Sequence, residues 1–243
     1  MGGKFADFPT RIRTVLILAI VCIPAVVFRT SLPWLFIAVC SLVATLSIIE
    51  AIWLLRKALA RSSTPWATTT RKLKENSYEA FFTIILEYAL GVTALILYDH
   101  TITWLIIISS FGYDIFAIIF GRLLGGKFFK KKPCPNLSEK KTWEGVIGGL
   151  ALSIILSWTY LIVFTNSSFS TGITPSAILA SVGGSIAFLG DLSCSRLKRL
   201  AKEKDSGTLL PGHGGALDRF ASLFAVAASY FFLYLPLYLS NIL

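Results

Sequence analysis

The sequence predicts an all-α, polytopic integral membrane protein with about seven transmembrane helices and basic cytoplasmic loops. Composition is the first observation: hydrophobic residues make up 55% of the 243 positions and charged residues 15%, whereas soluble domains are about 25% charged. The second is that the hydrophobic residues gather in runs close to the length of a bilayer-spanning helix. The third is that all Lys and Arg residues except Arg29 lie in the N-terminal segment and in alternate connections between these runs.

The hydrophobic runs give the expected helices in order. A helix needs about 20 apolar residues to cross a bilayer core. Runs near this length lie at residues 14–28, 32–55, 80–98, 101–120, 146–165, 174–190 and 219–239. The first run follows a basic start but precedes no small-x-small cleavage site, so we expect it to be a retained span. That run is short and the third contains Glu87, so the number of spans is uncertain by about one.

Charge predicts the orientation, because Lys and Arg in short loops stay in the cytoplasm. With the N-terminus inside, the cytoplasmic segments are residues 1–13, 56–79, 121–145 and 191–219, which together hold every Lys and Arg except Arg29. The net charge of +10 is therefore explained by orientation, and nucleic acid is not expected as a partner. The short loops favour a bacterial inner membrane.

No loop exceeds about 30 residues, which leaves no room for a separate soluble domain. We expect one membrane domain, with N-terminal transmembrane helices in residues 1–110 and a C-terminal transmembrane region in residues 111–243. A carboxylate at bilayer depth costs about 3 kcal/mol, so each acid there needs a polar partner or cavity. For Glu50 and Glu87 a structural interhelical partner is as plausible as catalysis, and Asp114 favours a polar cavity.

The segment from Gly190 to Phe220 has an unusual polar pattern. At helical spacing one face alternates acid, hydroxyl and base. These residues are Asp191, Ser195, Lys198, Lys202 and Asp205. A solvated helix with ion pairs gives the same pattern. We expect that helix to end near Ser206-Gly207.

The glycine-rich loop of residues 211–215 then leads into the last span, where backbone N–H groups of a helix N-terminus can bind a phosphate. Asp191 and Asp218, at the cytoplasmic ends of two spans, are expected to hold Mg²⁺, which prefers one or two carboxylates with phosphate oxygens and water. Zinc is not expected, because no His or Cys accompanies His213 at ligand spacing.

The second basic loop, residues 121–145, begins with a near match to a nucleotide P-loop at Gly121 to Lys127. The match fails because Phe128 stands where a P-loop has Ser or Thr. Further along the loop, Lys141 suits a phosphate and Trp143 suits the membrane interface. Attraction to anionic lipid is the alternative explanation for the lysines of this loop.

Together these motifs resemble the signature of the phosphatidate cytidylyltransferases, the CDP-diacylglycerol synthases. The signature has the order Ser-x-x-Lys-Arg, Lys-Asp-Ser-Gly, Pro-Gly-His-Gly-Gly and Asp-Arg, which this chain shows between Ser195 and Arg219. The blocks at residues 141–145 and 190–192 are also typical, so the resemblance covers about residues 110–235. Two departures are that Asp114 is not followed by the usual small residues and that the N-terminal half is shorter than in many members.

The resemblance implies transfer of a cytidylyl group from CTP to phosphatidic acid, which gives CDP-diacylglycerol and pyrophosphate with Mg²⁺ as cofactor. It implies that residues 111–243 are the catalytic region. It also implies catalytic roles for Asp191 and Asp218, as metal ligands, and for Lys198 and His213. The implied substrate-binding residues are Ser195, Arg199, Lys204, Asp205, Gly214, Gly215, Arg219, Ser138, Lys141, Thr142 and Asp114.

Two alternatives remain open at this stage. A CTP-dependent kinase of a polyprenol-type lipid would transfer the γ-phosphate, so the position of a phosphorus label distinguishes it. A transporter would need a continuous polar path across the spans, whereas the polar clusters here lie toward one face. The sequence also leaves a homodimer open.

Overall fold

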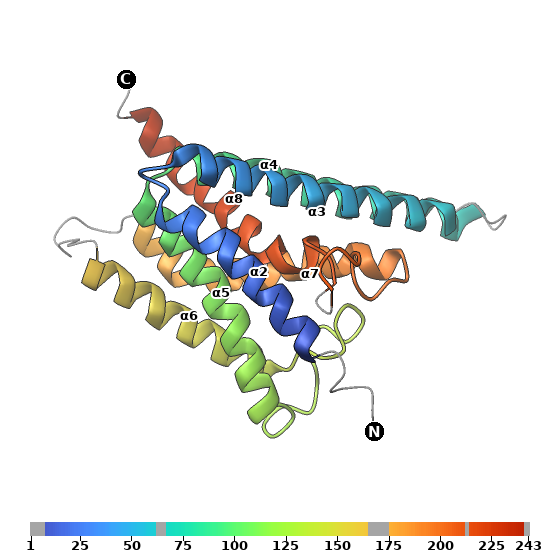
Figure 1. The fold of residues 1–243 in the computed structure, drawn as a ribbon. Coiled ribbons are helices and arrows are strands. Elements are labelled where there is room, and N and C mark those ends of the chain that lie inside the picture. The colour runs from blue at the N-terminus through green and yellow to red at the C-terminus, as the bar shows by residue number, and fades with distance from the viewer. Residues whose placement is uncertain (1–7, 62–66, 165–174, 212–213, 241–243) are drawn as a thin grey trace. The chain divides into compact units, whose positions relative to one another are not determined.

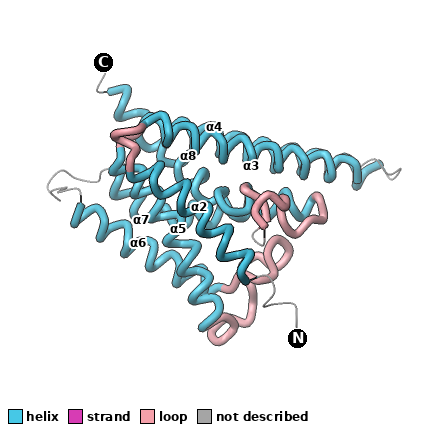
Figure 2. Tube along the Cα trace, in the orientation of Figure 1, coloured by secondary structure: helices cyan, strands magenta, loops and turns pink. Residues whose placement is uncertain are grey.

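The computed structural model describes residues 8–61, 67–164, 175–211 and 214–240. Within these ranges the regular structure is helical, apart from a single bridge between Leu210 and Gly214 (Figure 2). The helices are α2 (Phe8–Val27), α3 (Pro33–Arg61), α4 (Ala67–Leu97), α5 (His100–Leu123), α6 (Trp143–Phe164), α7 (Pro175–Leu200) and α8 (Leu217–Ser240) (Figure 1). Each predicted hydrophobic run corresponds to one of them, so the all-α fold class is confirmed.

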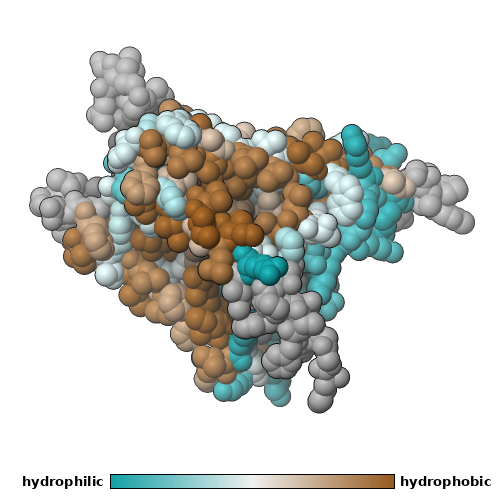
Figure 3. Space-filling view, in the orientation of Figure 1, coloured by the Kyte–Doolittle hydropathy of each residue, from teal (hydrophilic) through white to brown (hydrophobic). Residues whose placement is uncertain are grey.

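Five of the described helices are long and apolar enough to cross a membrane: α3, α4 from Arg71, α5, α6 and α7 from Ala177. The apolar part of α2, Leu16–Val27, is shorter. Large hydrophobic side chains stand exposed along these helices, for example Ile20, Phe82 and Ile162, and the surface in Figure 3 is largely hydrophobic over the helix shafts. In water such a surface would aggregate, whereas in a bilayer it faces lipid, so the chain is a polytopic membrane protein.

The chain divides into two compact units. The first unit contains Met1–Ile85 and Arg196–Phe220, and the second contains Leu86–Ser195 and Ala221–Leu243. The division expected from the sequence, at residue 110, concerns function, and the compact units do not follow it. The N-terminal helices instead share a unit with the segment that bears most of the signature residues.

In the first unit α2 contacts α3, and α3 buries small and branched residues at helical spacing. Ala51, Leu54 and Ala58 are fully buried on this face. The end of α7 in the same unit is a Schellman motif. Glu203 donates its N–H to Lys198 O at 2.8 Å, and Lys202 donates to Arg199 O at 3.0 Å.

This helix end corrects the sequence analysis. The helix was expected to continue to Ser206, which would place Lys202 and Asp205 on the face of Asp191, but α7 ends at Leu200. Lys202 has the left-handed φ of 56°, so it reverses the chain where a Schellman motif usually has glycine. Asp205 therefore lies in the loop beyond the helix.

In the second unit α5 and α6 lie side by side (Figure 1). Glycines allow this approach: a Cβ added to Gly145 would lie 2.7 Å from Ala117 O, and one added to Gly149 would lie 2.9 Å from Ala117 Cβ. Ser109 and Ser157 share a hydrogen bond of 2.9 Å across the two helices. Small residues and interhelical hydrogen bonds of this kind hold helices together where lipid removes any hydrophobic driving force.

Candidate functional site

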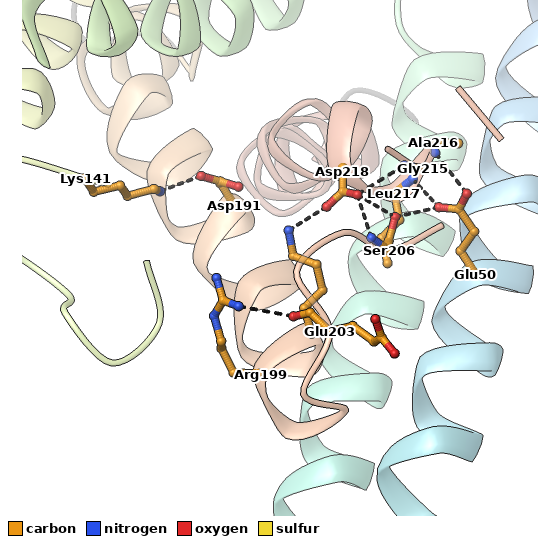
Figure 4. Close-up of polar contacts among 11 residues, drawn as sticks. Glu50, Lys141, Asp191, Arg199, Glu203, Ser206, Gly215, Ala216, Leu217 and Asp218 are labelled. Atoms are coloured by element: carbon orange, nitrogen blue, oxygen red, sulfur yellow. Dashed lines mark hydrogen bonds and ion pairs between the residues drawn. The ribbon is translucent and has the colours of Figure 1, made fainter. Parts of the chain in front are cut away.

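The carboxylate of Asp218 is the centre of the site in the first unit. Its side chain is 8% exposed, and Oδ1 accepts a hydrogen bond from Lys198 Nζ at 2.5 Å. Oδ2 accepts from Ser206 N–H at 2.6 Å, Ser206 Oγ at 3.0 Å and Gly215 N–H at 3.1 Å (Figure 4). Burial raises the pKa of Asp218, but the charge of Lys198 and these hydrogen bonds outweigh it, so the pKa lies below its usual value. The structure thus brings together three signature residues around an ionised carboxylate.

Glu50, on α3, is the second buried carboxylate of the first unit. Its Oε2 accepts from Ser206 Oγ at 2.7 Å and from Leu217 N–H at 3.0 Å, and its Oε1 accepts from Ala216 N–H at 3.2 Å (Figure 4). The residue before α8 is alanine, which has no side-chain acceptor to cap a helix. Glu50 supplies that cap from a distant part of the sequence.

The two carboxylates change the role expected for the glycine-rich loop. From the sequence, the backbone N–H groups at the start of α8 are expected to bind a substrate phosphate. In the structure they donate hydrogen bonds to carboxylates instead: Gly215 to Asp218, and Ala216 and Leu217 to Glu50. A Cβ on Gly215 would overlap Glu50 and the Ser206 hydroxyl. Glycine is needed here because the Glu50 carboxylate and the Ser206 hydroxyl pack directly against the backbone. Substrate contact by Gly214 and Gly215 stays a prediction.

Further contacts within the first unit hold the loop after α7. Lys57 of α3 forms an ion pair of 2.6 Å with Glu203, and Arg61 donates to Leu200 O at 2.7 Å. Thr14 of α2 donates to Pro211 O at 2.7 Å. Helices α2 and α3 therefore form the scaffold on which the signature loop is built, which the sequence did not reveal.

The remaining predicted residues of the first unit lie mostly on the surface. Exposed side chains are those of Arg199, Lys204, Asp205 and Arg219. Arg199 donates to Glu203 O at 3.2 Å, which adds to the closure of the α7 end. His213 lies outside the described residues. The segment thus carries three exposed cations, whereas its buried acids already accept hydrogen bonds.

The second unit contains a separate ion pair. Lys141, in the loop before α6, approaches Asp191 of α7 at 2.5 Å and lies 4.6 Å from the ring centroid of Phe188 (Figure 4). The side chains of Lys141 and Asp191 are 17% and 35% exposed, so the pair is partly shielded from water. Both residues were predicted for the site, and a partly desolvated ammonium beside a carboxylate suits exchange with a phosphate.

Other predicted residues of the second unit have structural partners. Thr142 Oγ1 accepts from Gly145 N–H at 3.2 Å and so caps α6. Asp114 of α5 accepts from Ser222 of α8 at 2.7 Å. Ser195 is buried, and Ser138 donates its backbone N–H to Cys134 O at 2.9 Å in a turn. Their proposed contacts with substrate stay predictions.

Glu87 also has an interhelical partner in the second unit. Its Oε1 accepts a hydrogen bond from Ser193 Oγ at 3.0 Å, which joins α4 to α7. Glu50 and Glu87 are thus both bonded across helices, which supports the structural reading of the two. Glu50 nevertheless holds the signature loop, and the signal that could have identified it is the alanine before α8, a helix start without its own cap.

Few of the described side chains are placed to bind a metal ion. Among the described residues no group of three or more His, Cys, Asp or Glu side chains is placed to hold a metal ion. Magnesium needs only one or two carboxylates when phosphate oxygens and water complete its shell, so Asp191 and Asp218 fit by chemistry. Asp218 Oδ2 already accepts three hydrogen bonds, which leaves Oδ1, now paired with Lys198, as the oxygen it can offer.

Comparisons with known proteins identify relatives of this chain. The chain is 43% identical over 114 residues to the phosphatidate cytidylyltransferase of Haemophilus influenzae, covering 45% of this chain and 39% of that protein. It is 38% identical over 137 residues to that of Rickettsia bellii, covering 54% and 57%, and 35% identical over 158 residues to that of Rickettsia felis, covering 62% and 67%. The chain therefore spans only part of the first two relatives' length. Residues 78–237 match the cytidylyltransferase family, so the chain belongs to that family.

Proposed function

We propose that this chain transfers the cytidylyl group of CTP to phosphatidic acid, forming CDP-diacylglycerol and releasing pyrophosphate. The observation that carries the proposal is the family match over residues 78–237, which includes the Lys198, Ser206 and Asp218 network. The names of the relatives support the choice of phosphatidic acid as acceptor. The apolar helices suit a substrate that lies in the membrane.

The reaction forms one P–O bond and breaks another. An oxygen of the lipid phosphate attacks the α-phosphorus of CTP, and pyrophosphate leaves with the electron pair of the broken bond. Both reactants are anions, so the protein contributes chiefly charge neutralisation and alignment, and no side-chain nucleophile is required. We assign neutralisation of the phosphates to Lys198, Arg199, Lys204 and Arg219.

The two ion pairs suggest how substrate binding begins. Lys198 donates a hydrogen bond to Asp218, and Lys141 forms an ion pair with Asp191. A substrate phosphate competes for each ammonium, and that exchange leaves carboxylate oxygens for Mg²⁺ at Asp191 and Asp218. Bound magnesium would supply positive charge to the phosphates and to the leaving pyrophosphate. Ser195 and Thr142 are proposed as hydrogen-bond donors to substrate, and His213 as a residue that orients a phosphate or gives a proton.

We further propose a bacterial inner membrane with the N-terminus and the basic loops in the cytoplasm. The distribution of Lys and Arg supports this orientation. It also places the exposed cations of the signature segment on the side where CTP is available. A homodimer remains open, and the proposed reaction does not require one.

The test is the fate of labelled CTP. Purified protein in detergent is given phosphatidic acid, Mg²⁺ and CTP labelled at the α- or the γ-phosphorus. Label from the α position alone should appear in lipid, and activity should disappear with EDTA and in Asp191→Ala and Asp218→Ala. Lipid labelled from the γ position would indicate a kinase, and no labelled lipid at all would refute both enzymes. Full activity of both Asp variants would refute the metal assignment.

A further inference from the structure

The loop after α5 carries an exposed cluster of aromatic and basic side chains, which we call the aromatic–basic tip. It consists of Lys127, Phe128, Phe129, Lys130, Lys131 and Lys132. Phe128 is 73% exposed and Phe129 is 48% exposed, and all the lysines of the tip are exposed. No acidic residue occurs between positions 115 and 138, so the charge of the tip is not balanced within its own segment.

The tip is held in place by a buried carboxylate. Glu144, in the first turn of α6 and 6% exposed, accepts the backbone N–H of Phe128 at 3.0 Å and of Phe129 at 2.9 Å, both on Oε1. Before the tip the chain turns at Gly126, whose φ is +80°. Because Glu144 holds the backbone of the two phenylalanines, the folded loop itself keeps their side chains exposed.

Two adjacent exposed phenylalanines are unfavourable in water. Moving such a side chain out of water into the acyl region of a bilayer is favourable, and an anionic bilayer attracts a nearby lysine. The tip begins four residues after Leu123, the last residue of α5, which is itself long and apolar enough to cross a membrane. Aromatic rings flanked by lysines at the end of a span match the chemistry of the headgroup layer.

We propose that the aromatic–basic tip docks into the headgroup layer of an anionic membrane leaflet, with both rings among the upper acyl chains and the lysines on lipid phosphates. The partner is therefore the surface of the host bilayer, recognised by its negative charge. The inference is independent of the proposed reaction, since it requires neither CTP nor turnover. It also gives Glu144 a role, as the residue that positions the tip.

The experiment measures the depth of a spin label at position 128. Phe128→Cys is made in a Cys22→Ala, Cys134→Ser background, where the remaining Cys40 and Cys194 are buried. The labelled protein is reconstituted in phosphatidylcholine vesicles with and without phosphatidylglycerol. Accessibility of the label to oxygen and to a water-soluble nickel chelate is then compared.

A matched control is Asn136→Cys, at an exposed position of the same loop outside the tip. With phosphatidylglycerol, the label at 128 should be several-fold less accessible to nickel than the label at 136 and more accessible to oxygen. Replacing the tip lysines by Gln should remove the difference between the two vesicle types. Equal nickel access at both positions in anionic vesicles would overturn the proposal. Protection of position 128 by CTP without anionic lipid would also overturn it, in favour of a nucleotide contact.

Discussion

Glu50→Ala is the substitution whose consequences the structure predicts most sharply. It removes the acceptor of the Ala216 and Leu217 N–H groups and one of the two acceptors of Ser206 Oγ. The Ser206 hydroxyl can still donate to Asp218, 3.0 Å away, so the loss concentrates on the two backbone amides. The first turn of α8 would then begin with alanine and no cap.

The magnitude follows from the burial of these groups. Each buried donor left without a partner costs about 1–3 kcal/mol, and loss of a helix cap typically costs about 0.5–2 kcal/mol. Water that enters the vacated space recovers part of this cost. We therefore expect the free energy of local opening to fall by about 3 kcal/mol, which raises the equilibrium constant for opening roughly 100-fold. Glu50→Gln keeps one carbonyl acceptor, so it should raise the equilibrium constant for opening only roughly tenfold.

Hydrogen exchange read by mass spectrometry measures this opening directly. Amides of the peptide around Ala216 and Leu217 should exchange roughly 100-fold faster in Glu50→Ala. In the proposed cytidylyl transfer, kcat should fall more than KM rises. The control is Glu79→Ala, which breaks an exposed ion pair of 2.9 Å with Arg196 and should change stability by less than about 1 kcal/mol. Unchanged exchange at positions 216 and 217 would refute Glu50 as the cap of α8.

Three further predictions concern the same unit. Lys198→Met removes the cation that pairs with the nearly buried Asp218, so kcat/KM should fall by more than about 100-fold. If the pair acts as one group, adding Asp218→Asn to this variant should lower kcat/KM little further. Gly215→Ala places a methyl group against the Ser206 hydroxyl, so thermal unfolding in detergent should occur well below the wild-type temperature, and unchanged unfolding would contradict the packing. Lys202→Gly relieves a left-handed residue, so it should raise stability by about 1 kcal/mol, and a lower Tm would count against the Schellman end of α7.

Hydropathy predicted where the helices lie but not how far they extend. The run at 32–55 became α3, which continues to Arg61, and the run at 80–98 became α4, which begins at Ala67. The length of an apolar run matches the thickness of the bilayer core, whereas a helix continues as long as its backbone hydrogen bonds are favourable. Ion pairs at i,i+4, such as Arg71 with Glu75 at 2.8 Å, support these polar extensions.

The charged residues of the site were predictable by type, but their pairing was not. The sequence predicts Asp191 and Asp218 as Mg²⁺ ligands and the lysines as partners of phosphates. The structure instead pairs Lys198 with Asp218 and Lys141 with Asp191, because partial burial disfavours an unpaired charge. The end of α7 was not predictable in the same way. A helical wheel assumes that the helix continues, and nothing in Lys202 indicates the positive φ that ends it.

The cap of α8 shows why a short signature is insufficient to build this site. The signature residues Gly215 and Asp218 satisfy one another, but the Ala216 and Leu217 amides between them need an acceptor that the signature does not contain. Glu50 supplies it from outside residues 78–237, the range that identifies the family. A buried helix N-terminus cannot leave its amides without partners in a low-dielectric environment, so an acceptor elsewhere in the chain must serve them. The N-terminal helices are thus part of the signature loop's structure.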